Sequence, residues 1–508
     1  MSRIRLKYSG LVVFSSKIFS LLTGLLFVLM ATRKLSVEDY GLWSALGAFT
    51  SYFVLPTALF TYWAGRDMSR GFPVIKSGSY LAAATSICCL AAFLLLLPLT
   101  ALSFKSAVPL LLLFALQIPL LHAVRWLEAI SYSVKPQALG YGAAAFEVVK
   151  VSSCAVLVLA FKQGLEGVVA SVAIAQLAQA LTLRLTLSSD IRGLWGNFNA
   201  NTVKKWLSKA YIPLYGQLSS IPYQLTLIVP ALWLGSTYPV ALMTVPREVS
   251  SVISYTSFLS LALAPKLLSG AGSGRDVEES IKLVLMASIP ATVGASILAK
   301  PLLHLLRPEY VVATPILVVL SLSELLRVMS WVWGSAIMGV EKVELNEKAK
   351  LKDYLKSKHF FMPTLGLASS IASLAILCLL ILAAKYLRLS HEQLVFAYFL
   401  STLLALSFPL QAYLWILARR SIAFRFPVKS VCKYLVASAV MALSVAATYP
   451  SAALGCHSAL EAAIAILPTI AVGLLSYVLT LMVIDAETRR LVLLVVKKPR
   501  TILAGSTS

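Results

Sequence analysis

Long apolar runs, separated by short polar stretches, repeat along the whole chain. Each run is close to the roughly 20 residues that an α-helix needs to cross a hydrocarbon core of about 30 Å. The pattern therefore predicts an all-α polytopic membrane protein with about fourteen transmembrane helices. The predicted spans are Ser9–Thr32, Tyr40–Gly65, Gly78–Thr100, Ala107–Ile130, Ala138–Phe161, Leu165–Leu187, Ala210–Leu234, Tyr238–Ala264, Ile281–Ala299, Val312–Met338, Leu365–Ala384, Leu394–Leu417, Val431–Thr448 and Leu460–Ile484.

Composition agrees with this class. Hydrophobic residues make up 59% of the 508 residues and charged residues only 13%, whereas a soluble domain carries about 25% charged residues. The connections on the predicted outer side are short, so no ectodomain remains to hold a catalytic site. We therefore expect a membrane protein that is not an enzyme.

The distribution of basic residues predicts the orientation. The chain has 44 Lys and Arg and a net charge of +23, yet the predicted outside loops hold only 8 of these basic residues. The positive-inside rule then places both termini in the cytoplasm of a cell membrane protein. The net charge is accordingly a topology signal with some attraction to anionic lipid heads, and it does not indicate nucleic-acid binding.

Motifs for nucleotides and metals are incomplete. The Gly-rich segment Gly270–Arg275 lacks the Lys-Ser/Thr pair of a phosphate-binding P-loop. His391-Glu392 begins an HExxH pattern, but Val395 stands where the second zinc ligand should be. The six cysteines include no CxxC pair. We expect no cofactor, no metal and no ATP hydrolysis by this chain.

Several predicted spans carry ionisable residues far from their ends, where each charge costs roughly 2.5–3.5 kcal/mol on insertion scales. Two sets form i, i+3 pairs on one helix face, and a third pair is adjacent in sequence. One interpretation is that these residues lock helices together. The other is that they line a water-filled cavity. The residues are Lys17, Glu147, Lys150, Arg247, Glu248, Glu324 and Arg327.

The balance of these charges favours an anionic cargo. Four basic residues, Lys17, Lys150, Arg247 and Arg327, stand against three acids, and guanidinium groups match phosphate oxygens. We predict that the four basic residues bind substrate. The three acids, Glu147, Glu248 and Glu324, are candidates for coupling to H⁺ or Na⁺, or else fixed counter-ions of their neighbours.

Prolines mark a candidate moving part. Pro213, Pro222 and Pro230 all fall in the seventh predicted span, and each removes a helical hydrogen bond and favours a kink. Bent helices beside a cavity are typical of alternating access, although a static kink that improves packing is the alternative.

A weak internal repeat suggests two lobes. Leu35–Tyr40 (LSVEDY) precedes the second span, and Leu234–Tyr238 (LGSTY) precedes the eighth. We predict six-helix lobes at residues 1–200 and 201–418 around a central cavity lined mainly by the first, second, seventh and eighth helices. Residues 419–508 then hold two additional helices and a cytoplasmic C-terminal segment. The two helices either face lipid or line an apolar groove for a polyprenyl tail.

Two loop segments carry a family resemblance. Ala31–Trp43 reads ATRKLSVEDYGLW and resembles the segment after the first helix of Wzx-type flippases for polysaccharides and lipid-linked oligosaccharides, in the multidrug/oligosaccharidyl-lipid/polysaccharide (MOP) exporter superfamily. Pro301–Leu317 resembles that family's segment before the tenth helix, with Arg307-Pro308 in place of the usual Phe-Gly. The resemblance implies two six-helix lobes that move a glycan on a polyprenyl phosphate or pyrophosphate from the inner to the outer leaflet.

Two other functions stay open from the sequence. A multidrug exporter of the same fold would want an acidic, aromatic-lined cavity, which the surplus of positive charge disfavours. A membrane glycan polymerase or ligase would usually need a long outside loop, which is absent. For the flippase, the expected partners are the lipid-linked glycan and membrane lipids, and other membrane proteins of glycan assembly are candidates.

Overall fold

The protein is almost entirely helical. The computed structural model describes residues 6–188, 191–260, 263–268, 272–341, 355–456, 458–486 and 488–489, and these contain helices, turns and no strand. The all-α prediction is confirmed.

Eleven helical segments of the described residues are long and apolar enough to cross a membrane, and each overlaps one predicted span. This pattern is that of a multi-pass membrane protein. The segments are Val37–Ser69, Ile75–Phe104, Val108–Val134, Gln137–Ala160, Gly164–Leu187, Gly274–Ile297, Pro308–Gly339, Phe360–Leu387, His391–Ser421, Val428–Ala447 and Ala459–Ile484.

The other three predicted spans take different forms, so the count of fourteen is not confirmed. The first lies within α1 (Leu6–Lys34), a 29-residue helix. The seventh is split into α9 (Tyr211–Gln217) and α10 (Ser220–Trp233), and the eighth ends early as α11 (Tyr238–Ser254) before a 3-10 helix, η4 (Tyr255–Ser260). Pro222 explains the split, because it fits the first turn of α10 but could not continue a helix from α9.

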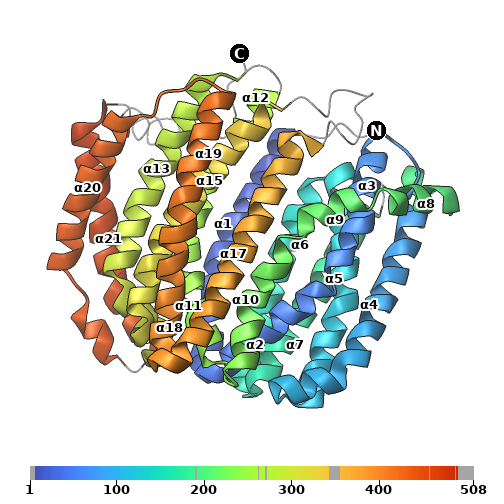
Figure 1. The fold of residues 1–508 in the computed structure, drawn as a ribbon, viewed down its shortest axis with the longest axis horizontal. Helices are drawn as coiled ribbons and strands as arrows, with labels where there is room; N and C mark the ends of the chain where they lie inside the picture. Colours follow the sequence, from blue (N-terminus) through green and yellow to red (C-terminus); the bar gives the residue numbers. More distant parts are fainter. Residues whose placement is uncertain are drawn as a thin grey trace. The chain divides into compact units, whose positions relative to one another are not determined.

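Contacts divide the chain into two compact units. Unit 1 comprises Met1–Thr244 and Pro363–Leu394. Within it α1 packs on α6, α6 on α7, and α7 on α5, while α2 packs on α10. Figure 1 shows the axes of these helices roughly parallel to one another. Besides α1, α9 and α10, its helices are α2 (Val37–Tyr52), α3 (Ala58–Ser69), α4 (Ile75–Phe104), α5 (Val108–Val134), α6 (Gln137–Cys154), α7 (Gly164–Leu187), α8 (Ala200–Ser208) and most of α17 (Lys358–Leu387).

An apolar cluster packs several helices together at one end of unit 1. Phe60 and Trp126 pack edge to face with ring centroids 5.8 Å apart, and both are buried together with Trp206 of α8. The Trp126 ring also lies where a side chain on Gly78 would stand, because a Cβ there would be 2.1 Å from it. The cluster fixes the short helix α8 against α3, α4 and α5.

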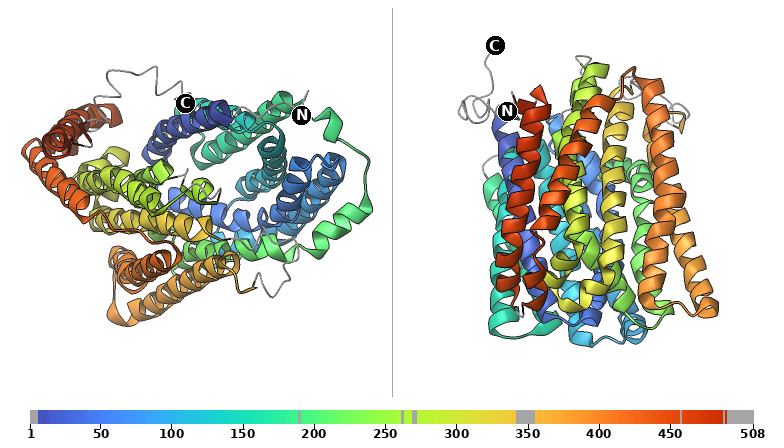
Figure 2. Two further views of the ribbon diagram at one scale, coloured as in Figure 1. Left: turned by 90° about the horizontal axis from the view of Figure 1, so that it is seen from above. Right: turned by 90° about the vertical axis from the view of Figure 1, so that its left-hand side faces the viewer.

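Unit 2 comprises Val245–Met362 and Val395–Ser508. Here α13 packs on both α15 and α20, and α20 packs on α21. Figure 2 shows α20 and α21 side by side at one edge of this unit. The helices are α12 (Leu263–Leu268), α13 (Gly274–Ile297), α14 (Ala299–Leu306), α15 (Thr314–Gly339), α18 (His391–Thr402), α19 (Phe408–Ser421), α20 (Val428–Ala447) and α21 (Ala459–Ile484), with α11 and α18 each beginning in unit 1.

The bounds of the two units differ from those of the two predicted lobes. The division into six-helix lobes therefore stays a prediction. In unit 1, the two loops of the predicted repeat touch each other. Thr237 Oγ1 donates a hydrogen bond of 2.7 Å to the Glu38 carbonyl, and the Gly41 backbone lies so close that a Cβ there would be 1.9 Å from the Thr237 carbonyl oxygen. This contact fixes the start of α2 against the start of α11.

Candidate functional site

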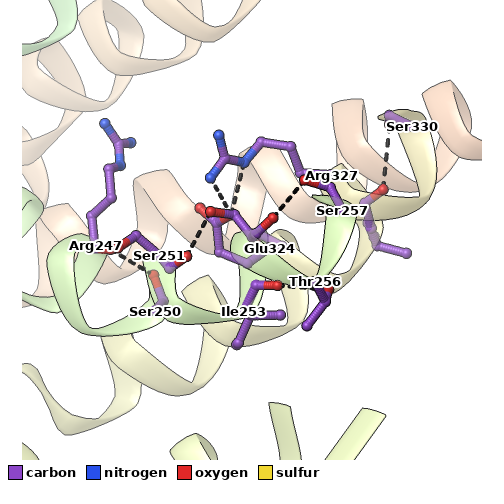
Figure 3. A network of polar contacts seen from close by, with 12 residues as sticks. Arg247, Ser250, Ser251, Ile253, Thr256, Ser257, Glu324, Arg327 and Ser330 are labelled. Atoms are coloured by element: carbon purple, nitrogen blue, oxygen red, sulfur yellow. Dashed lines mark hydrogen bonds and ion pairs between the residues drawn. The ribbon is translucent and has the colours of Figure 1, made fainter. Parts of the chain in front are cut away.

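An ion pair stands near the middle of α15 in unit 2 (Figure 3). Arg327 Nε donates a 2.7 Å hydrogen bond to Glu324 Oε2, and the Arg327 Nη2 group binds the same oxygen. The carboxylate side chain is 6% exposed, whereas the Arg327 side chain is 61% exposed. One edge of the guanidinium thus neutralises the buried acid, while the rest of Arg327 remains open to its surroundings.

A second arginine lies on the neighbouring helix α11. Arg247 follows Pro246, and its guanidinium carbon is 5.5 Å from the centre of the Phe399 ring of α18. It is close enough to Glu324 for an electrostatic interaction. Figure 3 shows Arg247 and Arg327 on either side of Glu324. The structure therefore brings together three of the predicted site residues, two basic and one acidic.

Hydroxyl groups follow Arg247 along α11 and η4. Ser250, Ser251, Thr256 and Ser257 each donate to the carbonyl three residues back, at distances of 2.7–3.1 Å. Their oxygens keep acceptor capacity after this donation. The sequence interpretation did not include these residues. A Ser/Thr-rich run within an otherwise apolar predicted span could have indicated these polar residues.

The second i, i+3 pair lies in unit 1 between α1 and α6. Lys150 Nζ is 2.8 Å from Glu147 Oε2, which also accepts a 2.7 Å hydrogen bond from Thr23 Oγ1. The ammonium lies 5.2 Å and 5.0 Å from the ring centres of Phe27 and Phe146. Both charged side chains are largely buried, at 11% and 9% exposed. These contacts favour the interpretation that this pair locks helices together, and a substrate role for Lys150 stays a prediction.

For the remaining predicted site residues, the structure gives the helix on which each lies. Lys17 lies in α1, and its side chain is outside the described part of the structure. Glu248 is exposed on α11 next to Arg247. Among the described residues, no three His, Cys, Asp or Glu side chains cluster as a metal site would require.

Solved structures of membrane transporters share this fold. The lipid II flippase MurJ, in an inward closed conformation, matches with a TM-score of 0.57 at 14% identity over 95% of this chain and all of that chain. The MATE multidrug transporter DinF-BH gives 0.56 at 15% identity over 84% and 99%. An inward-facing multidrug resistance MATE family transporter of the MOP superfamily gives 0.53 at 10% identity over 78% and 95%.

The sequence comparisons find no relatives, because no protein-family model and no curated protein matches the chain. At identities this low the structural matches establish the fold alone. The chain has the fold of MOP-type transporters. This confirms the resemblance at the level of the superfamily fold, while the Wzx-type family itself is not confirmed.

Proposed function

We propose that this protein is an alternating-access transporter that moves an oligosaccharide linked to a polyprenyl phosphate or pyrophosphate from the cytoplasmic to the outer leaflet of the cell membrane. Both termini lie in the cytoplasm in this proposal. The observation that carries it is the pair of arginines, Arg247 and Arg327, around the buried Glu324. The similarity to the lipid II flippase MurJ supports the same class of cargo.

The geometry suits a phosphate. Because Glu324 occupies one edge of the Arg327 guanidinium, the remaining N–H groups are left to donate to a phosphate oxygen. Arg247 adds a second planar donor on the neighbouring helix. The hydroxyl oxygens of Ser251 and Ser257, next to these arginines in Figure 3, can accept hydrogen bonds from sugar hydroxyls.

A multidrug exporter is the second candidate, because the fold is as similar to MATE transporters as to the flippase. Such a site would need surplus negative charge to hold a lipophilic cation. With Glu248 beside Arg247, the cluster of two arginines and two glutamates carries no surplus of negative charge. Its two guanidinium groups favour the anionic lipid. A glycan polymerase or ligase is the third and weakest candidate.

Deletion of the gene separates these functions. We expect the deletion strain to accumulate a lipid-linked oligosaccharide in the cytoplasmic leaflet, measured as the fraction of that lipid oxidised by periodate in inside-out vesicles, and the wild-type gene to reverse the accumulation. An unchanged pool of lipid-linked glycan, together with new sensitivity to a lipophilic cation such as ethidium, would support the multidrug exporter instead.

A further inference from the structure

Unit 1 contains a pocket whose lining includes none of the charged residues predicted within the spans. It has a volume of about 620 Å³ and lies between the loop that joins α3 to α4 and the segment that leads into α8. Its lining includes Asp67, Phe72, Asn197, Phe198, Asn201 and Lys205. Both wall segments are inside loops in the predicted topology, so the pocket faces the cytoplasm in the orientation proposed above.

The two walls are fixed to each other. The Lys76 amide donates to the Trp195 carbonyl at 3.0 Å, and the Asn199 amide donates to Ser77 Oγ at 2.9 Å. Gly196 has a φ of +59°, and a Cβ there would be 2.1 Å from the Pro73 carbonyl oxygen. Only glycine fits this conformation and this approach without strain. The pocket is therefore a defined part of the fold.

The acidic residue of the lining is also fixed. Asp67 is 8% exposed, and its Oδ2 accepts a 2.9 Å hydrogen bond from the indole of Trp206 in α8. The start of α8 is already capped, because Asn199 Oδ1 accepts from the amides of Asn201 and Thr202 at 2.9 and 3.3 Å. The helix terminus is thus occupied by its own side chain, which disfavours an anion at this point.

The chemistry of the lining suits a neutral polar ligand. Asn197 and Asn201 are exposed, and each amide both donates and accepts hydrogen bonds. The rings of Phe72 and Phe198 are 54% and 51% exposed. One carboxylate, Asp67, is balanced by one ammonium, Lys205. Sugar rings present hydroxyls that donate and accept together with apolar C–H faces that can lie on an aromatic ring.

The start of α8 lines the pocket, and this helix has the features of a helix at a membrane surface. α8 contacts the end of α4, and Figure 1 shows it lying across that end. Trp206 is buried on one side of α8, while Lys204 and Lys205 are exposed on the other. A short helix of this kind is typical of the interface between membrane and water. In the proposed topology this is the cytoplasmic interface, where the sugars of a membrane lipid would lie.

We infer that this pocket is a first binding site for the sugar portion of the lipid-linked glycan before it enters the transport path. The inference rests on the proposed function for its substrate and its membrane side. The pocket would then be a second binding site for the substrate. It binds sugar hydroxyls, whereas the two arginines bind the phosphate.

The test uses the purified full-length protein and a lipid-free probe. Oligosaccharides are released with mild acid from the lipid-linked pool of wild-type cells, and their binding is measured by isothermal titration calorimetry. The double variant N197A/N201A should bind the probe roughly tenfold more weakly than wild type, because two neutral hydrogen bonds are lost. The matched control Lys204→Gln, on the same helix but outside the lining, should bind like wild type. Size-exclusion and thermal unfolding profiles confirm that the variants fold.

Equal affinities of the wild type and N197A/N201A, or no binding by the wild type, would overturn the pocket assignment. This binding assay needs no transport, so its result is independent of flipping. If reconstituted protein flips lipid-linked glycan but does not bind the free sugar, only the pocket assignment fails. If the free sugar binds but no glycan is flipped, the transport function fails while the sugar site stands.

Discussion

Glu324 and Arg327 form an ion pair one turn apart on α15 in which only the acid is buried. The buried carboxylate fixes the direction of the arginine, and the arginine neutralises a charge that would otherwise be costly in the span. This relationship makes two roles separable by mutation, because stability depends on the pair whereas phosphate binding depends on the open edge of Arg327.

The first prediction concerns the stability of this pair. Arg327→Ala leaves Glu324 buried without its cation. We expect the free energy of unfolding in detergent to fall by about 1–3 kcal/mol, less than for a fully buried pair because Arg327 is exposed. Adding Glu324→Gln should restore most of this loss.

Arg125→Ala is the matched control. Arg125 forms the same i, i+3 pair with Glu128, but the side chains are 54% and 28% exposed. We expect a change of no more than about 0.5 kcal/mol. Equal losses in the Arg125 and Arg327 variants would show that burial of Glu324 does not matter.

The second prediction separates structure from transport at Lys150. Lys150→Ala leaves the buried Glu147 without its ammonium partner, so we expect a loss of about 3–5 kcal/mol in unfolding free energy. The double variant K150M/E147Q should regain most of the stability and flip glycan at nearly the wild-type rate. A stable double variant that fails to transport would instead support a transport role for this pair, either the predicted phosphate role of Lys150 or the predicted coupling role of Glu147.

The third prediction tests the close approach of α2 to the loop before α11. Gly41→Ala would place a Cβ 1.9 Å from the Thr237 carbonyl oxygen, so backbone must move, at a cost of about 1–3 kcal/mol. Gly47→Ala on the same helix meets nothing within 4 Å and should be neutral or slightly stabilising. Thermal unfolding in detergent compares the two. Equal melting temperatures would contradict the contact.

The fourth prediction concerns energy coupling. Glu147 and Glu324 are held by basic neighbours, so we expect them to act as counter-ions. Glu248 is the exposed acid of the predicted three. In vesicles with H⁺ and Na⁺ gradients set independently, any acceleration of flipping by a gradient should be lost in Glu248→Gln.

Glu166→Gln, an exposed acid at the start of α7, is the control for that experiment and should keep the gradient response. A wild-type response retained in Glu248→Gln would exclude Glu248 as the coupling acid.

Much of the fold could be predicted from the sequence because a spanning helix requires a long apolar run, and such runs have no other common use. The break at Pro222 is harder to predict. The proline itself indicates a kink, yet whether a helix bends or stops depends on what packs around it. The i, i+3 pairs at Glu147 and Glu324 were also predictable, since helical periodicity alone brings their partners together.

The tertiary partners were not predictable. Thr23 and Phe27 reach the Glu147 and Lys150 pair from a different helix, and Phe399 reaches Arg247 from α18. No local spacing joins positions so far apart in the sequence. The same holds for the pocket of Asp67, whose opposite wall follows more than a hundred residues later along the chain.

The central claim is that Arg247 and Arg327 bind the phosphate of a lipid-linked glycan. Its most direct test is the initial rate of flipping of that lipid in proteoliposomes that contain the wild type, Arg247→Ala, or Arg327→Ala combined with Glu324→Gln to preserve stability. We predict that both variants fold, insert into the membrane and lose at least about 90% of the flipping rate. This loss corresponds to one missing charged hydrogen bond, which contributes roughly 1.5–3 kcal/mol. Wild-type rates in both variants would contradict the account.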